Sequence, residues 1–175
     1  MSSPVHNKVY LVTGSASGMG LATAHTLLFR GAKLAACDIN EKNLEEFYSN
    51  LEAAKQMDTL TGLVDVRNKS DLRKFAQQAK SHFGRLDGVA NFAGTGGHEL
   101  GTESVWETSD DEGVIDTPMH RANVTRVKNF VPAPTTPIAR DGTAQEVANV
   151  VVFLLGTESS FVTDDAWSVD GGANA

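Results

Sequence analysis

The sequence predicts an α/β fold, in which helices wind around both faces of a mostly parallel sheet. In the first half of the chain, short aliphatic runs alternate with segments whose apolar residues recur at helical spacing. Such alternation of strand and helix implies parallel pairing with right-handed crossovers. The chain has 175 residues, 41% of them hydrophobic and 21% charged, so it can bury a core, and we expect one domain over residues 1–175.

The first half of the chain contains four predicted strands, each followed by a turn or a helix. The strands are expected at residues 9–12, 32–38, 59–66 and 86–94. A glycine-rich turn and a helix to about Arg30 follow the first strand. The next two helices are indicated by apolar residues at helical spacing, namely Leu44, Phe47, Tyr48 and Leu51, and then Leu72, Phe75, Ala76, Ala79 and Phe83. Gly84 is expected to end the latter helix.

The second half of the chain breaks this rhythm. One weak helical segment is expected around residues 103–112, and the loop "VPAPTTPIARDG" follows later. Thr143 and Glu146 then form a capping box, which predicts the start of a helix. That helix carries one apolar face, made of Val147, Val150, Val151 and Leu154. The segment 166–169, "AWSV", is predicted to be a last strand closed by "DGG".

The turn "VTGSASGMG" places three glycines, Gly14, Gly18 and Gly20, between the first strand and the first helix. Glycines in this position permit a tight turn and let backbone N–H groups approach a pyrophosphate at the helix N-terminus. The hydroxyls of Ser15 and Ser17 add further donors. A glycine-rich loop that binds no ligand is the alternative interpretation.

Asp38 ends the second strand, 18 residues after Gly20. A carboxylate at this point accepts hydrogen bonds from both ribose hydroxyls of an adenosine. A 2′-phosphate would instead meet a negative charge, and residues 15–17 include no lysine or arginine to offset it. The sequence therefore favours NAD over NADP as the cofactor.

The chain resembles the short-chain dehydrogenase/reductase family in motifs that follow the family's order from residue 8 to residue 172. These motifs are "TGxxxGxG" at 13–20, Asp38, the pair Asp65 and Val66, "NFAG" at 91–94, "GVIDTP" at 113–118 and "VDGG" at 169–172. The resemblance implies a Rossmann-like, doubly wound sheet and a small-molecule alcohol or carbonyl as substrate. It departs from the family at Phe92, where a second Asn is usual, and at Glu112, where a Pro is usual.

The resemblance also assigns roles along the cofactor. Asp65 and Val66 would lie along the adenine, Asn91 under the adenosine ribose, and Ile115 and Thr117 at the nicotinamide carboxamide. The complete set of expected cofactor-binding residues is Gly14, Ser15, Ser17, Gly18, Met19, Gly20, Asp38, Asp65, Val66, Asn91, Gly94, Ile115 and Thr117.

The family's catalytic Ser and its Tyr-x-x-x-Lys motif have no counterpart in the sequence. The chain has two tyrosines, Tyr10 and Tyr48, and Gly14 and Glu52 stand where the lysine would be. We therefore predict no catalytic residue. The acidic segment that ends at Glu112 runs directly into the late-fold motif at Gly113, so the sequence predicts that one deletion removed two central βα units.

Three hypotheses about function follow from these observations. The chain is a family oxidoreductase whose catalysis is severely impaired or lost, a non-catalytic dinucleotide-binding module, or a truncated product that needs a partner chain to fold. Loss of the central units is expected to uncover an apolar sheet face, through which copies of the chain would associate.

Composition limits the other function classes. The net charge of −7 argues against nucleic acid or an anionic membrane as a partner. A single cysteine, Cys37, and the lack of an apolar leader segment lead us to expect a cytoplasmic protein. The five histidines have no metal-ligand spacing, and the acidic residues between Glu99 and Glu112 are interpreted as a solvated helix face. No metal site is expected.

Overall fold

The computed structural model describes residues 3–94, 114–126 and 136–173. Its centre is a four-stranded parallel sheet in the order β3-β2-β1-β4. The strands are β1 (Val9–Thr13), β2 (Lys33–Asp38), β3 (Thr59–Leu63) and β4 (Gly88–Asn91). All four strands predicted in the first half are confirmed. β3 ends three residues earlier than expected, and β4 begins two residues later and ends three residues earlier.

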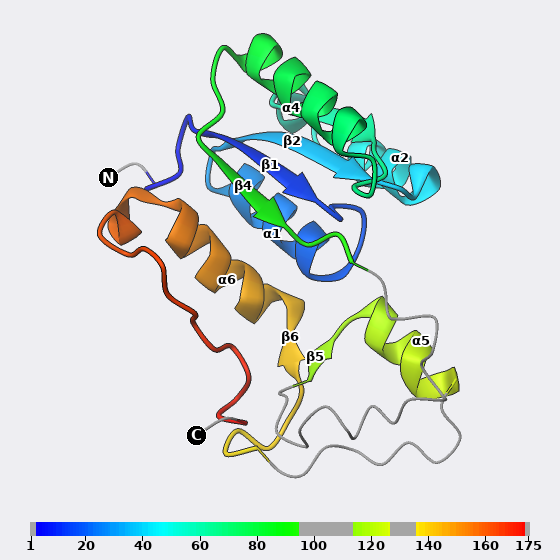
Figure 1. Ribbon diagram of the computed structural model, residues 1–175, viewed down its shortest axis with the longest axis vertical. Coiled ribbons are helices and arrows are strands. Elements are labelled where there is room, and N and C mark those ends of the chain that lie inside the picture. Colours follow the sequence, from blue (N-terminus) through cyan, green and yellow to red (C-terminus); the bar gives the residue numbers. More distant parts are fainter. Residues whose placement is uncertain (1–2, 95–113, 127–135, 174–175) are drawn as a thin grey trace.

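Helices connect and cover these strands (Figure 1). They are α1 (Gly18–Phe29), α2 (Glu41–Ser49), α3 (Ala53–Met57), α4 (Lys69–Phe83), α5 (Pro118–Arg126) and α6 (Ala144–Leu155). Two-residue strands β5 (Ile115–Asp116) and β6 (Gly142–Thr143) pair with each other in a separate parallel ladder. A short 3-10 turn (Thr157–Ser159) follows α6. The short helices α3 and α5 were not predicted.

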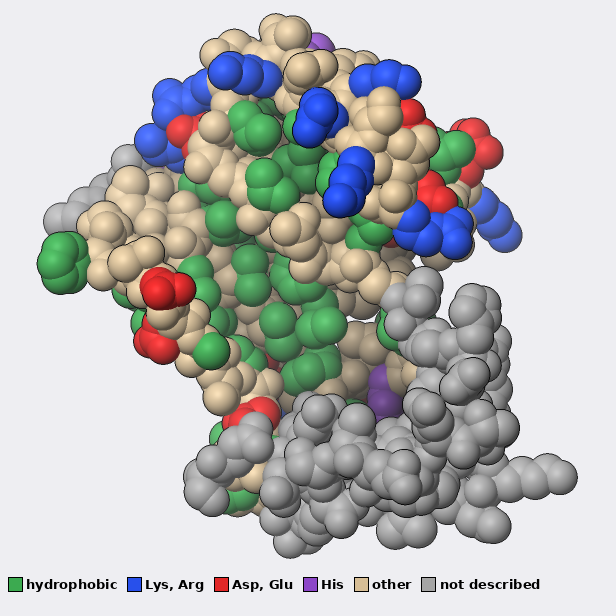
Figure 2. Space-filling model, viewed as in Figure 1, with side chains coloured by type: hydrophobic (Ala, Val, Ile, Leu, Met, Phe, Trp, Pro, Cys, Tyr) green, Lys and Arg blue, Asp and Glu red, His purple; other side chains and the backbone are tan. Residues whose placement is uncertain are grey.

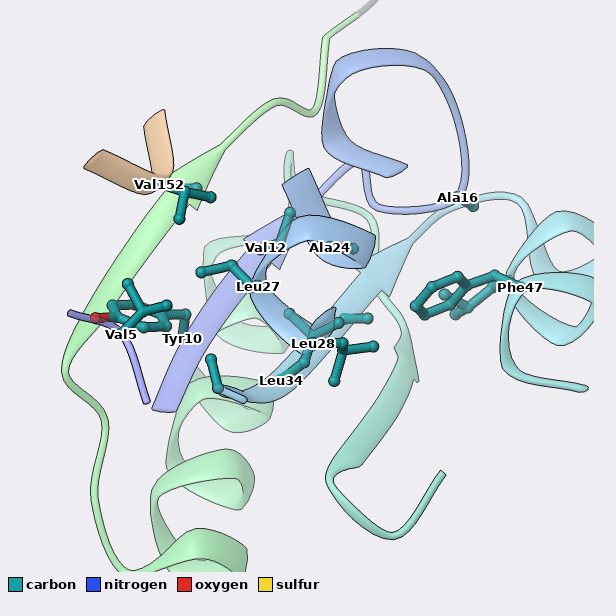
Figure 3. Packing of buried hydrophobic residues seen from close by; sticks show 14 residues of the cluster. Val5, Tyr10, Val12, Ala16, Ala24, Leu27, Leu28, Leu34, Phe47 and Val152 are labelled. Atoms are coloured by element: carbon teal, nitrogen blue, oxygen red, sulfur yellow. The ribbon is translucent and has the colours of Figure 1, made fainter. Parts of the chain in front are cut away.

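One face of the sheet packs against α1, α2 and α6. Alternate residues of β1 and β2, such as Tyr10, Val12 and Leu34, point into this core, where they meet Leu27 of α1 (Figure 3). α6 reaches the same core from the far end of the chain through Val152, which is 1% exposed. α1 lies between the sheet on one side and α6 on another, and its Ala24, Leu27 and Leu28 are at most 2% exposed.

Two polar contacts fix α6 over α1 and β1. The buried hydroxyl of Tyr10 donates to the carbonyl oxygen of Leu155, at 2.8 Å, and burial raises the pKa of this tyrosine. At the other end of α6, the Gln145 amide donates to Thr26 Oγ1, at 2.9 Å. The predicted capping box of α6 is confirmed, since Thr143 and Glu146 bond each other's backbone N–H groups.

The opposite face of the sheet is covered by α4. Leu11 and Cys37 from the strands meet Phe75 and Ala79 of α4 in a second, smaller core. α4 begins at Asn68, whose side chain accepts from Ser70 N, and ends at Gly84, whose φ of +76° is the left-handed conformation that glycine adopts freely. Gly84 thus ends this helix as predicted. Cys37 is fully buried, and burial raises the pKa of its thiol to about 12, which fits the expected core role.

The second face is open at β4. In the β1–β4 register Val89 lies beside Leu11 and therefore points to the α4 face, yet Val89 is 47% exposed whereas Leu11 is 1% exposed. On the side of β4 away from β1, no other strand pairs with it among the described residues. Figure 2 shows hydrophobic side chains gathered across the middle of the face of the molecule that Figure 1 displays.

The predicted strand at 166–169 is wrong. These residues form no ladder, and Trp167 is 44% exposed, with its ring stacked on Phe153 of α6 at 5.5 Å between centroids. A strand needs a neighbour with unpaired backbone groups, and the last segment runs along the outside of α6 instead of reaching β4 (Figure 1). The expected helix at 103–112 and the junction between residues 112 and 113 lie outside the described residues.

Candidate functional site

The turn between β1 and α1 is built by glycines in conformations that other residues adopt at a cost. Gly14 has φ +65° and Gly18 has φ +52°. A Cβ at Gly20 would lie under 3.0 Å from the Gly14 carbonyl oxygen, and a Cβ at Gly14 would lie 2.8 Å from Ala93 N. The turn therefore closes tightly on itself and on the loop after β4, which only glycine allows.

The N-terminus of α1 is available to an anion. Ser17 caps the helix, but its exposed side chain makes no capping hydrogen bond, and the first turn contains no acidic residue. The unpaired N–H groups and the positive end of the helix dipole at such a terminus favour phosphate. Met19 is half-buried in this first turn.

Ser15 has a structural role in the turn. Its buried hydroxyl donates to the Cys37 carbonyl oxygen, at 3.1 Å, and its N–H donates to the same oxygen, at 3.2 Å. In this arrangement the hydroxyl joins the turn to the end of β2. The expected contact of Ser15 with phosphate stays a prediction.

Asp38 stands at the carboxyl end of β2 and faces the same turn. Its Oδ2 accepts from Ala16 N, at 3.0 Å, and its Oδ1 accepts from Asn40 N, at 2.9 Å. Two backbone donors thus orient the half-buried carboxylate beside the phosphate-binding turn. The sequence placed the acid on β2, and the structure brings it into contact with the glycine-rich turn.

Asp65 and Val66 follow β3 and adjoin the end of β2, because Val64 N donates to the Asp38 carbonyl oxygen, at 2.9 Å. Both residues are half-buried. The guanidinium of Arg67 bonds both oxygens of the Asp65 carboxylate and lowers the pKa of Asp65. Arg67 thus holds both oxygens of Asp65, as backbone N–H groups hold both oxygens of Asp38.

Asn91 ends β4 opposite Thr13, and it is exposed, as is Gly94. The sequence reasoning did not include Thr13 among the site residues, although Thr13 opens the glycine motif. Its buried Oγ1 accepts from Phe92 N and Ala93 N, both at 3.2 Å, and so holds the loop after β4 against the turn. A threonine directly before the first glycine was the available signal.

Phe92 replaces the usual second Asn and packs against the α1 core. Its Cβ lies 3.3 Å from where a Cβ on Gly20 would stand, so Phe92 closely approaches the start of α1.

Ile115 and Thr117 lie in the separate β5–β6 region. Ile115 pairs with Gly142 across the ladder. Thr117 is 9% exposed, and its Oγ1 accepts from His120 N at the start of α5, at 3.3 Å. The side chain of Thr117 also lies 3.4 Å from where a Cβ on Gly18 would stand, which brings this residue to the phosphate-binding turn.

The described residues contain no group of three or more His, Cys, Asp or Glu side chains that could hold a metal ion. No helix within the described ranges is long and apolar enough to cross a membrane.

A pocket of about 470 Å³ lies beside β5 and β6, and Ile115 is the one residue of the predicted site that lines it.

The arrangement fits the adenosine and pyrophosphate portion of a dinucleotide. Gly14 and Gly20 let the turn close tightly at the N-terminus of α1, which has no side-chain cap, and Asp38 presents an oriented carboxylate next to it. These residues come from the carboxyl ends of neighbouring parallel strands, where ligands of open α/β sheets bind.

Comparison with known proteins agrees with this geometry. Residues 8–133 match the family described as short chain dehydrogenase, and residues 111–174 match the family described as Enoyl-(Acyl carrier protein) reductase. The short-chain dehydrogenase/reductase aba4 of Botryotinia fuckeliana is 35% identical over 149 residues, which are 85% of this chain and 57% of that protein. The chain thus spans little more than half the length of that relative.

Two further matches extend over nearly the whole chain. The relative ABA4 of Pyricularia oryzae is 28% identical over an alignment of 251 positions, which covers 96% of this chain and 92% of that protein. A solved short-chain dehydrogenase/reductase from Brucella melitensis has the same fold, with a TM-score of 0.80 at 20% identity over 99% of both chains.

NAD(P) is the cofactor typical of the oxidoreductases in which these motifs occur. The parallel sheet order, the phosphate-binding turn and the family match over residues 8–133 lead to one assignment. The chain belongs to the short-chain dehydrogenase/reductase family.

Proposed function

We propose that this chain is a dinucleotide-binding member of the family in which turnover of a small-molecule alcohol or carbonyl is severely impaired or lost. One observation carries the binding part of the proposal. The Asp38 carboxylate is held at the N–H of Ala16, in a glycine-rich turn that leads into the uncapped N-terminus of α1. When bound, the dinucleotide would supply the hydride-transfer chemistry of the family.

NAD is the proposed cofactor, in preference to NADP. The carboxylate of Asp38 would repel a 2′-phosphate, and the adjacent residues Ser15, Ala16 and Ser17 carry no positive charge. The remaining expected site residues, Asp65, Val66, Asn91 and Gly94 on the adenosine side and Ile115 and Thr117 on the nicotinamide side, are part of this proposal.

The loss of catalysis is proposed from the sequence between the two matched ends of the fold. Neither Tyr10 nor Tyr48 is followed by a lysine at the required spacing. An internal deletion between Glu112 and Gly113 accounts for this, and the 251-position alignment supports it, since the relative supplies many positions that a 175-residue chain cannot match. Sequencing the transcript against genomic DNA across codons 112 and 113 tests whether the short form is made in the cell.

Two alternatives keep their own support. The intact turn and Asp38 favour a single-domain, non-catalytic binding module. We also propose a cytoplasmic location, since the free, buried Cys37 fits a reducing environment. The 47% exposure of Val89 on β4 favours a truncated product that associates with a second copy or needs a partner chain.

The proposal is tested by thermal unfolding of the 175-residue chain with saturating NAD and, separately, NADP. Stabilisation follows RT ln(1 + [L]/Kd), about 2.7 kcal/mol at a hundredfold excess over Kd. We expect NAD to raise the Tm more than NADP. Asp38→Asn should reduce the NAD effect, whereas Asp58→Asn, at the opposite end of the strands, should not. Equal shifts with NAD and NADP would contradict the preference, and no shift with either would contradict binding.

Association through β4 is tested by sedimentation velocity. Val89→Lys puts a charge on the open strand and should lower the oligomeric fraction. Gln77→Lys on the exposed side of α4 adds the same charge elsewhere. Equal effects from both variants would indicate a response to net charge alone.

A further inference from the structure

We propose that the face of the sheet left open at β4 docks an amphipathic helix of a partner protein, which lies beside α4 and carries acidic residues along the edge that meets α4. This docking site is separate from the candidate dinucleotide site. It follows from an apolar strip and a row of cations that lie next to each other on the α4 face.

The apolar strip is formed by Val89 of β4 with Leu72 and Ala76 of α4. Val89 is 47% exposed on this face, and the two helix residues are half-buried at the border of the second core. Phe75 marks the other border of the buried side of α4, because its ring lies directly against Gly62 of β3. In the sheet order β3-β2-β1-β4, the side of α4 away from Phe75 is therefore the side towards β4.

A row of three cations follows the strip along α4. The row consists of Lys69, Arg73 and Lys80. At about 100° per residue the three side chains fall within about 40° of one another around the helix axis, next to Ala76 and away from Phe75. All three are exposed, and within the described ranges none forms an ion pair, whereas Lys74 pairs with Asp71 at 3.4 Å. Figure 2 shows Lys and Arg side chains beside the hydrophobic ones in the upper part of the view.

Helix stability accounts for only one cation of this row. Lys80, in the last turn of α4, suits the negative end of the helix dipole, but Lys69 is the first residue of the helix, where the dipole disfavours a cation. Solubility does not require the row either, because the chain carries a net charge of −7. A local positive row on an acidic chain instead favours an acidic partner.

The strip and the row together specify the partner. From residue 69 to residue 80 the row runs along about 16 Å of α4, which is about three turns. A helix packed along α4 at about 8–10 Å would lay its apolar stripe over Val89 and set glutamates or aspartates against the cations. A second copy of this chain fits less well, because pairing of the same face about a two-fold axis would set like charges near one another.

Binding of synthetic helical peptides to the 175-residue chain tests the proposal. The probe is a fluorescently labelled peptide of about three heptads, with leucine at positions a and d and glutamate at e and g. Its control has lysine at e and g. By fluorescence anisotropy we expect the acidic peptide to bind at least about tenfold more tightly than the basic one. The same acidic peptide with serine in place of leucine should not bind.

A matched pair of variants locates the binding surface. Arg73→Glu should weaken binding of the acidic peptide by about fivefold or more, because it puts an acid into the row. Lys42→Glu makes the same change in net charge on the exposed side of α2, across the sheet, and should change the Kd by less than about twofold. Both substitutions are on exposed positions, and urea denaturation checks that both variants fold.

Three results would overturn the proposal. One is equal affinity for the acidic and basic peptides, or binding of neither. Another is an equal loss of affinity in Arg73→Glu and Lys42→Glu, which would indicate a response to net charge. The third is a dimer of the chain, seen by sedimentation velocity, that the acidic peptide does not dissociate, since a second copy would then occupy the face. None of these results bears on the binding of NAD.

Discussion

Helices cover the two faces of the central sheet to different degrees. On one face α1, α2 and α6 enclose a core that includes Leu27 and Leu34, both 0% exposed. On the other face α4 covers Leu11, while Val89 on the neighbouring strand is 47% exposed. The difference teaches that the carboxyl edge of a parallel sheet keeps its order when the helices of one face are complete, even where the opposite face stays open at one strand.

The largest expected effect is that of cutting a large side chain out of the complete face. Leu27→Ala in α1 should lower the free energy of unfolding by about 2–5 kcal/mol, because the surrounding core can only partly collapse into the cavity. Val89→Ala on the open face should change it by no more than about 0.5 kcal/mol. Urea denaturation measures both. Similar costs for the two variants would mean that the open strand is covered in solution.

The glycine-rich turn leads into α1, on the face that α1, α2 and α6 cover. It should tolerate no side chain where Gly20 approaches the Gly14 carbonyl oxygen. Gly20→Ala places a methyl group against the Gly14 carbonyl, and the backbone must shift at a cost of about 1–3 kcal/mol. Gly84→Ala has no neighbour within 4 Å and meets only the backbone strain of its φ, about 1–2 kcal/mol. Loss of NAD binding is expected for Gly20→Ala alone. An unaltered affinity in that variant would show that the turn is not the phosphate site.

Thr13 joins the end of β1 to the loop after β4, at the edge of the sheet where the ligand is expected. Thr13→Val removes the side-chain acceptor of Ala93 N and one of the two acceptors of Phe92 N, which also donates to the Thr13 carbonyl oxygen, and should cost about 1–2 kcal/mol of unfolding free energy. Thr13→Ser keeps the hydroxyl and should cost less. Amide hydrogen exchange at residue 93 should accelerate in the valine variant only. Equal exchange rates in both variants would remove the proposed role of the hydroxyl.

The smallest expected effect on stability is that of Glu146, in the capping box at the start of α6. Arg140 and the Thr143 backbone lower the pKa of Glu146 from 4.5 to about 2. A carboxyl with a lowered pKa stabilises the fold above its ordinary pKa, and this contribution is lost as the pH falls towards about 2. The ion pair of Arg140 and Glu146 is solvent-exposed, so its contribution to the free energy of unfolding is small.

The variant Glu146→Gln should therefore have a slightly lower urea midpoint than the unmodified protein at neutral pH. The difference should shrink as the pH falls from 4.5 towards about 2. Glu158→Gln, exposed on the turn after α6, serves as the control. A difference that persists unchanged at low pH would mean that the carboxyl acts through its shape as a helix cap and not through its charge.

Local patterns predicted much of the fold because they report short-range physics. Apolar spacing located α2 and α4, the capping box located the start of α6, and Gly84 ended α4. The sequence also predicted the glycine-rich turn, because its glycines are required by the backbone geometry of a few adjacent residues. Asp38 was placed correctly on β2, but its contact with Ala16 depends on two segments that meet only in the fold.

The failures are long-range. Residues 166–169 have the composition of a strand, yet a strand exists only if another strand presents unpaired groups to it, and Trp167 stacks on Phe153 instead. The role of Thr13 was missed because its partners, Phe92 and Ala93, are distant in sequence. The hydrogen bond of the Ser15 hydroxyl to the Cys37 carbonyl oxygen was likewise not foreseen, because the two residues lie on different segments.

The sequence alone determined the alternation of strands and helices in the first half of the chain, the glycine-rich turn and the absence of a Tyr-x-x-x-Lys motif, because each depends on residues a few positions apart. The tertiary structure decided that α6 docks on α1 and β1 through Val152 and Tyr10, and that β4 remains open. Those outcomes depend on which surfaces meet, and burial of apolar area between segments far apart in the chain is a property of the whole fold.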